Sequence, residues 1–305
     1  MSIPPLARLK DTLLDLRYRA EYAGLRVIVA LVRAMPLDLA VRVSAWCWRT
    51  IAPWQRRHTR ALNNLSIAFP DKSEEAREAI ACAMWANLGR VMAETMQLDR
   101  IVADPSRIEI ASQHIFQRYK GRLGPAVGVT LHMGNWELAI WPLTAGGGVP
   151  AAVYRSVNNP YVDRYLRDQR KILYPGGLLA KGREEDSKKT VRIITDYVRK
   201  GGRLGIVSDL HDNQGIAVPF FGTPAKSVAA PALIARRLGV RIWMARCVRI
   251  GNESRFRIEM KELKVTRTGN QGEDIRTITA AMQAQFEAWI RETPEQWMWS
   301  NRRWS

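Results

Sequence analysis

Short apolar runs that alternate with amphipathic segments constrain the fold of this chain more than any other feature. From residue 121 onward the apolar, often β-branched runs are AVGVTL, PAAVY, RLGIVS, VRIWMARCV and FRIEM. The helical candidates that separate or follow them lie at 135–143, 160–173, 187–200, 228–238 and 272–291. Strands that alternate with helices build a sheet covered by helices. The pattern predicts an α/β fold with a mixed central sheet flanked by helices.

The N-terminal part of the chain has a helical character instead. Residues 20–55 are apolar, but Arg26, Arg33 and Arg42 interrupt the stretch and Pro36 breaks it. A membrane-spanning helix needs about 20 consecutive apolar residues. Two amphipathic helices hinged at Pro36 therefore fit this stretch better than one spanning helix.

Another helix is expected over residues 73–98, where apolar side chains recur at helical spacing and acidic residues follow Ser73. The change of character along the chain suggests two regions. We expect residues 1–120 to form membrane-associating helices packed on the core, and residues 121–305 to form the α/β domain.

Aromatic and basic side chains cluster at the end of the apolar N-terminal stretch and just beyond it. The cluster consists of Trp46, Trp48, Trp54, Arg49, Arg56, Arg57 and Arg60. Tryptophan favours the headgroup level of a bilayer, and arginine attracts anionic lipid. We therefore predict a monotopic anchor on a membrane surface. The alternative is an ordinary helical hairpin packed on the core.

The composition excludes several classes of protein. With 47% hydrophobic and 25% charged residues, the chain is neither disordered nor collagen-like. Its three cysteines are far apart and only four histidines accompany them, so neither a zinc site nor a disulfide framework is expected. This cysteine usage favours a reducing compartment. Because the N-terminus lacks the pattern of a secretory signal, we expect the chain to stay on the cytoplasmic side.

The net charge of +18, carried mainly by arginine, suits a phosphate-bearing partner, although a GC-rich genome produces the same bias without selection for binding. Tryptophan intermixed with arginine is compatible with nucleic-acid binding through the backbone and base stacking. The basic residues are spread along the chain, however, and no recognisable nucleic-acid module is present. We therefore expect no nucleic-acid partner, and keep this class as an alternative.

The segment GVTLHMGNWELA, residues 128–139, carries the clearest chemical signal. His132 follows a strand-like run, and Gly134 and Asn135 then turn into a predicted helix that contains Glu137. At such a junction the imidazole and the carboxylate can converge. A carboxylate that accepts from one ring nitrogen leaves the other nitrogen free to act as a base.

His132-x4-Glu137 resembles the H-x4-D/E motif of the bacterial lipid A biosynthesis acyltransferases, the lauroyl/myristoyl acyltransferase family. Four further segments are similar to family motifs in the same order, namely ALNNLSIAFPD (61–71), YRSVNNPYVDRYLRDQR (154–170), GIAVPFFGTPAKSVAAPALIARRLGV (215–240) and PEQWMWSNRRW (294–304). Together they span nearly the whole chain. One departure is Ser208-Asp209-Leu210-His211-Asp212, where family members commonly carry Asp-Gln.

The resemblance implies a glycerolipid-acyltransferase-like fold and direct transfer of an acyl chain from a thioester to a hydroxyl of a lipid A precursor. The donor would be acyl carrier protein or coenzyme A, used as a co-substrate, with no metal or other cofactor. His132 would be the general base, and Glu137 would orient its imidazole. The enzyme would work at the cytoplasmic face of the bacterial inner membrane.

Four further residues are candidates for substrate binding. Arg155 and Arg170 would hold the oxyanion or the sugar phosphates, and Asn135 and Asp209 would contribute polar contacts. Trp136 and the Phe220–Phe221 pair are expected to line part of an acyl groove. Backbone donors around Gly134 are the alternative for the oxyanion.

Two other functions remain open. The first is acyl transfer to another membrane lipid, such as a glycerol phosphate, an ornithine lipid or an inositol mannoside. The second is a basic, non-enzymatic membrane-surface protein, which would leave the His132–Glu137 junction unexplained.

Overall fold

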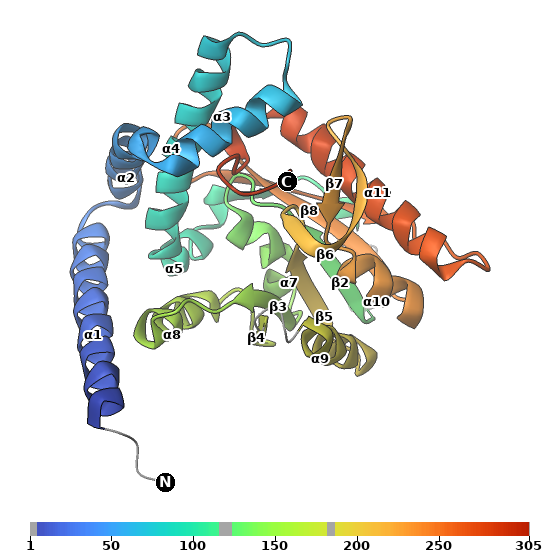
Figure 1. Ribbon diagram of the computed structural model, residues 1–305, viewed down its shortest axis with the longest axis horizontal. Helices are drawn as coiled ribbons and strands as arrows, with labels where there is room; N and C mark the ends of the chain where they lie inside the picture. Colours follow the sequence, from blue (N-terminus) through green and yellow to red (C-terminus); the bar gives the residue numbers. More distant parts are fainter. Residues whose placement is uncertain (1–4, 116–123, 182–186, 305) are drawn as a thin grey trace.

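A mixed seven-stranded sheet forms the centre of the computed structural model, which describes residues 5–115, 124–181 and 187–304 (Figure 1). The strand order is β1-β9-β8-β2-β5-β3-β4. The strands are β1 (Ile108–Ile110), β2 (Ala126–Thr130), β3 (Pro150–Arg155), β4 (Leu178–Lys181), β5 (Arg203–Val207), β8 (Arg241–Arg249) and β9 (Phe256–Leu263). Strand β2 runs parallel to β5 and β8, and β9 is antiparallel to β8. The predicted α/β fold with a mixed sheet is confirmed.

The predicted helices after residue 121 are confirmed with one exception. They are α8 (Pro160–Arg170), α9 (Ser187–Arg199), α10 (Ala230–Leu238) and α11 (Gln271–Glu292). Where one helix was expected over 135–143, a 3₁₀ helix, η3 (Trp136–Ile140), leads into the short α7 (Trp141–Ala145). Pro142 is the reason, because it has no backbone N–H to continue an α-helical ladder from the preceding turn.

The β6–β7 hairpin was not foreseen from the sequence. Strands β6 (His211–Phe220) and β7 (Thr223–Ser227) pair antiparallel beside the main sheet. Phe221 and Gly222 connect them, with φ angles of 53° and 73°. Two successive residues with positive φ are typical of the tight turns that match the twist of a hairpin.

The N-terminal region is helical as predicted, although the helix at residues 56–68 was not foreseen from the sequence. Its helices are α1 (Pro5–Ala34), α2 (Leu37–Ile51), the 3₁₀ helix η1 (Ala52–Trp54), α3 (Arg56–Ala68), α4 (Glu74–Thr95) and the short α5 (Leu98–Val102). Pro36 separates α1 from α2, as the hinge prediction requires. Ser73 caps α4 by accepting a hydrogen bond from the N–H of Ala76 at 3.2 Å.

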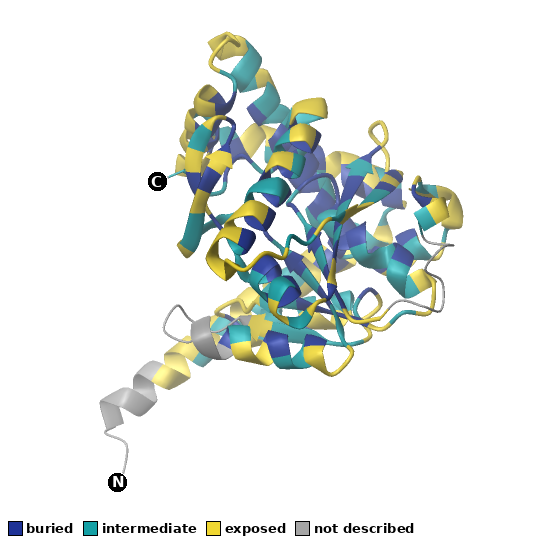
Figure 2. Ribbon diagram, turned by 90° about the vertical axis from the view of Figure 1, so that its right-hand side faces the viewer, coloured by how far each residue is buried: buried dark blue, intermediate teal, exposed yellow. Residues whose placement is uncertain are grey.

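One hydrophobic core joins the helical region to the sheet. Leu65 of α3 and Trp85 of α4 are fully buried, and they belong to the same cluster as Val127 of β2 and Trp297 near the C-terminus. The division at residue 120 stays a prediction. Helix α1 lies at the outside of this body, where it contacts α2 and α8 (Figures 1 and 2).

The tryptophans of the proposed anchor separate into two groups. Trp46 and Trp54 are 67% and 90% exposed. Trp48 instead stacks on Trp85 at a centroid distance of 6.1 Å, so it packs between α2 and α4 rather than at headgroup level. None of the helices in the described ranges combines the length and the apolar character needed to cross a bilayer.

Candidate active site

The candidate site lies where two neighbouring parallel strands end. His132 follows β2, and Asp209 follows β5. The backbone N–H of Ser208 donates to the carbonyl of Thr130 at 3.0 Å, so the two chains stay paired up to the site. Because the strands are parallel, both residues emerge at the same edge of the sheet. The sheet itself therefore brings them together.

Asp209 holds His132 through two hydrogen bonds. Oδ1 of Asp209 lies 2.8 Å from Nδ1 of the imidazole, and Oδ2 accepts from the backbone N–H of His132 at 2.9 Å. An ionised carboxylate has no proton to donate, so in the neutral imidazole Nδ1 carries the proton and Nε2 presents its lone pair. The side chain of His132 is 18% exposed, whereas that of Asp209 is fully buried. The imidazole is thus both oriented and accessible.

The electrostatics of the pair favour the charged forms of both groups. Burial, the largest single influence, would lower the pKa of His132, but the nearby carboxylates, Asp209 foremost, together raise it above its ordinary value of 6.5. Glu137 acts in the same direction, and Arg170 opposes it. Burial by itself would also raise the pKa of Asp209, yet His132 and Trp297 hold that pKa below its usual range.

The partner of Glu137 differs from the prediction. Both of its oxygens accept from Arg170, with Oε1 at 2.6 Å from Nη2 and Oε2 at 2.9 Å from Nε. Among the described residues, the carboxylate that hydrogen-bonds the imidazole is therefore Asp209 and not Glu137. The reason is topological: Asp209 follows the neighbouring strand and points at His132, whereas Glu137 lies in the first turn of η3 and points at Arg170.

The turn between His132 and η3 requires a glycine. Gly134 has a φ of +56°, and a Cβ there would lie 1.8 Å from the carbonyl oxygen of Cys247. The N–H of Gly134 donates to the carbonyl of Gln296 at 3.0 Å, and its carbonyl accepts from Asn87 at 3.1 Å. This N–H is consequently engaged and does not point to a free oxyanion site.

Asn135 is held by the buried ion pair between Glu94 and Arg249. Its Nδ2 donates to Glu94 of α4 at 2.9 Å, and it is fully buried. Arg249 of β8 donates to the same Glu94 oxygen at 2.8 Å and also to Asn87 at 3.0 Å. Buried charges of this kind are found where they are paired and hydrogen-bonded. Asn87, Glu94 and Arg249 lie on elements distant in sequence, so no local pattern pointed to them.

The family of the protein follows from a match along nearly the whole chain. Residues 7–305 match the model of the bacterial lipid A biosynthesis acyltransferases. The chain belongs to this family. A search among curated proteins found no match. As a lipid A biosynthesis acyltransferase, the protein is an enzyme of the bacterial lipid A pathway, and the family implies an acyl donor and a lipid A precursor as acceptor.

The two arginines expected at this acyltransferase site lie in different surroundings. Arg170, at the end of α8, is partly buried against Glu137. Its Nη1 makes no hydrogen bond within the part of the chain that the structure describes. Arg155 ends β3, which is two strands away from β2, and its side chain is exposed. With strands about 4.8 Å apart, the backbones of β3 and β2 are separated by about 10 Å.

The aromatic residues expected along the acyl groove are also divided. Trp136 packs edge-on against the His132 imidazole, with ring centroids 5.1 Å apart. Phe220 and Phe221 are 0% and 6% exposed and pack against Trp297, Trp299 and Trp304. The phenylalanine pair thus belongs to the core beneath the site, whereas Trp136 lies at its surface.

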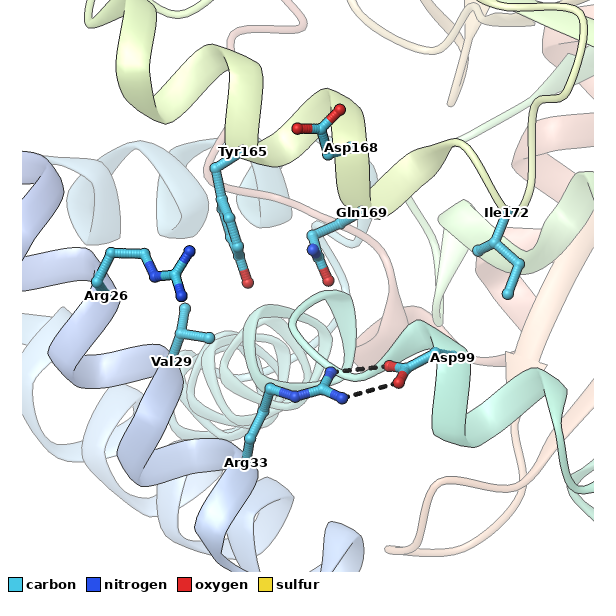
Figure 3. Close-up of a pocket in the computed structure, with 8 residues that line it drawn as sticks. All are labelled: Arg26, Val29, Arg33, Asp99, Tyr165, Asp168, Gln169 and Ile172. Carbon is cyan, nitrogen blue, oxygen red and sulfur yellow. Dashed lines mark hydrogen bonds and ion pairs between the residues drawn. The ribbon is translucent and has the colours of Figure 1, made fainter.

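One cavity lies outside the His132 region. It has a volume of about 360 Å³ and lies between α1 and α8, where Figure 3 shows Tyr165 pointing inward and Arg33 paired with Asp99. His132 does not line it. Among the described residues, no group of three or more His, Cys, Asp and Glu side chains is placed to hold a metal ion.

Proposed function

We propose that this enzyme transfers an acyl chain from a thioester to a hydroxyl of a lipid A precursor, with His132 as the general base. The observation that carries the proposal is the contact between Asp209 and Nδ1 of His132, which leaves Nε2 as the proton acceptor at an accessible edge of the sheet. A base positioned in this way is what an alcohol nucleophile requires.

In the proposed reaction, Nε2 of His132 takes the proton of the acceptor hydroxyl while its oxygen bonds to the thioester carbonyl carbon. The tetrahedral intermediate then collapses, the carbon–sulfur bond breaks, and the imidazolium returns the proton to the departing thiolate. Asp209 stabilises the imidazolium throughout. No covalent acyl-enzyme and no cofactor enter this scheme.

Arg170 is the group best placed to meet the negative charge of the intermediate or of a substrate phosphate. Glu137 fixes its guanidinium through two hydrogen bonds, and Nη1, which has no hydrogen-bond partner among the described residues, is available for a ligand. Glu137 therefore acts in this proposal by positioning Arg170 and by adding negative potential at His132. Arg155 would bind a more distant anionic group of the acceptor.

The acyl donor is proposed to be acyl carrier protein or coenzyme A. Both carry the thioester on an anionic carrier, and the net charge of +18 favours their approach. Acyl carrier protein remains the expected protein partner. Trp136 would form the part of the acyl groove next to the reacting carbon.

Attachment to the cytoplasmic face of the inner membrane is proposed from the surface of the N-terminal helices. Exposed large apolar side chains continue from α1 through α2 to η1, and they include Leu13, Leu16, Val27, Ile28, Leu31, Leu39, Val43, Trp46, Ile51 and Trp54. A run of this length along successive elements is typical of a helix that lies in a bilayer interface. The acceptor lipid would then reach His132 without leaving the membrane.

Two measurements test the proposal. Mass spectrometry of the lipids from a strain that lacks this protein should show lipid A with one acyl chain fewer, and the normal mass should return with the wild-type chain. The purified His132→Ala variant should lose about 10²- to 10⁴-fold in kcat while keeping its melting temperature. Unchanged lipid A together with an altered glycerolipid or ornithine lipid would overturn the assigned acceptor.

A further inference from the structure

The C-terminal segment of the chain, residues 294–304, runs directly past the proposed catalytic pair. The N–H of Met298 donates to the carbonyl of His132 at 3.0 Å, and Trp297 forms an isolated antiparallel bridge with Met133. The indole of Trp297 points at Asp209, where Nε1 donates to Oδ2 at 2.7 Å. A segment remote in sequence thus supplies a direct contact to the buried carboxylate.

We propose that Trp297 is a positioning residue whose indole N–H holds one oxygen of Asp209 and limits the negative charge that the carboxylate presents to His132. This inference rests on the proposed function for the role of His132 as a base. In this proposal Trp297 contacts neither substrate nor the reacting atoms, and it influences His132 only through Asp209.

The two carboxylate oxygens of Asp209 have different hydrogen-bond partners, and this difference supports the role of Trp297. Oδ1 faces the imidazole, while Oδ2 receives both the Trp297 indole and the backbone N–H of His132. Asp209 is completely buried, so no solvent replaces a lost donor. A hydrogen bond to a buried charged acceptor is stronger than one between neutral groups. Removal of the indole N–H would leave Oδ2 with one donor fewer and more charge on the carboxylate.

The indole has little freedom to move. Trp297 is 1% exposed and packs against Trp299 at 4.6 Å and Phe220 at 5.8 Å between ring centroids. Close packing on two sides fixes the direction of the N–H. The donor is therefore preorganised and does not have to be ordered during the reaction.

The other charged groups around the pair would remain in place if only the indole N–H were removed. Glu137 and Arg170 face His132 from η3 and α8, and Arg303 faces Asp209 from the C-terminal segment. Burial lowers the pKa of Arg303 to about 10, so it remains a cation at neutral pH. It is held by Ser227, through an Oγ 2.8 Å away, and by Gln283. A change in the titration of His132 can therefore be assigned to the missing donor.

Trp299 provides a matched control in the same segment. It is also fully buried and also uses its indole N–H, but it donates to the backbone carbonyl of Pro294 at 2.7 Å. Trp297→Phe and Trp299→Phe each remove one buried indole from the same aromatic cluster. Only the first removes a donor from Asp209.

The experiment compares the pH dependence of kcat/KM in the wild type and the two variants, together with the titration of His132 by ¹⁵N NMR. Because a less neutralised Asp209 stabilises the imidazolium, Trp297→Phe should raise the pKa of His132 by roughly half a unit to one unit. Activity at neutral pH should fall up to about tenfold and recover as the pH rises. Trp299→Phe should leave the titration unchanged.

Two results would overturn the inference. One is an unchanged His132 titration in folded Trp297→Phe, and the other is an equal shift in Trp299→Phe. If Trp297→Phe does not fold, the same titration is carried out with benzothienylalanine at position 297. This tryptophan isostere keeps the ring volume and removes only the N–H. The titration is independent of turnover, so it decides the inference even if the wild type transfers no acyl chain and the proposed function fails.

Discussion

His132 has two acidic neighbours whose contacts assign them different tasks. Asp209 hydrogen-bonds the ring at Nδ1, whereas both oxygens of Glu137 are engaged by Arg170. Each carboxylate raises the pKa of the imidazole, and Asp209 has the larger effect. The orienting acid and the anchor of the arginine are therefore separable by substitution.

Asp209→Asn is expected to affect the base more than Glu137→Gln does. Loss of the Asp209 charge removes the main force that raises the pKa of His132, so the acid limb of kcat/KM should move to lower pH. The amide also no longer fixes the tautomer, and kcat should fall roughly 10²- to 10⁴-fold. Glu137→Gln should shift the limb less and mainly weaken binding through Arg170. Equal shifts in both variants would contradict this assignment.

At the scale of the structural elements, the turn from β2 into η3 is constrained by contacts from three sides. Gly134 combines a positive φ with a close approach to the backbone of β8, and Gln296 and Asn87 tie its peptide groups from two other directions. The position of His132 next to this turn depends on contacts from β8, α4 and the C-terminal segment.

Gly134→Ala should destabilise the fold and inactivate the enzyme together. Gly251 is the control, because its φ of +66° is similar but a Cβ there would meet nothing within 4 Å. Gly251→Ala should cost about 1–2 kcal/mol through backbone strain alone. Gly134→Ala should exceed that by about 2 kcal/mol or more, because the backbone of Cys247 must move. Chemical denaturation of both variants gives the difference, and similar losses would show that the collision is relieved without cost.

Across the molecule, the exposed apolar side chains and the basic charge are expected to cooperate at a membrane. The full chain should bind vesicles that contain phosphatidylglycerol, and high salt should weaken this binding without abolishing it. Trp46→Ser combined with Trp54→Ser should remove most of the salt-resistant part, because both side chains are exposed. Vesicle sedimentation measures this. If the full chain does not bind anionic vesicles at low salt, the predicted membrane anchor is wrong.

Local patterns in the sequence were sufficient for most of the fold. The strand-like runs became β2, β3, β5, β8 and β9, and Pro36 and Ser73 marked helix boundaries as expected. Side-chain periodicity and backbone chemistry act over a few residues, so they are readable along the chain. The short strands β1 and β4 and the β6–β7 hairpin carried too little pattern to be recognised.

Local patterns also pointed to His132 at the end of a strand, but the predicted contact between Glu137 and its imidazole was wrong. Glu137 is five residues away, whereas Asp209, Trp297 and Glu94 come from a neighbouring strand, the C-terminal segment and helix α4. Which distant groups meet depends on strand order and on packing over the whole core, and neither is encoded in short-range spacing. The residue types therefore singled out His132 as the candidate base, and only the tertiary structure decided which carboxylate hydrogen-bonds its imidazole, because that contact is made between residues that follow two parallel strands.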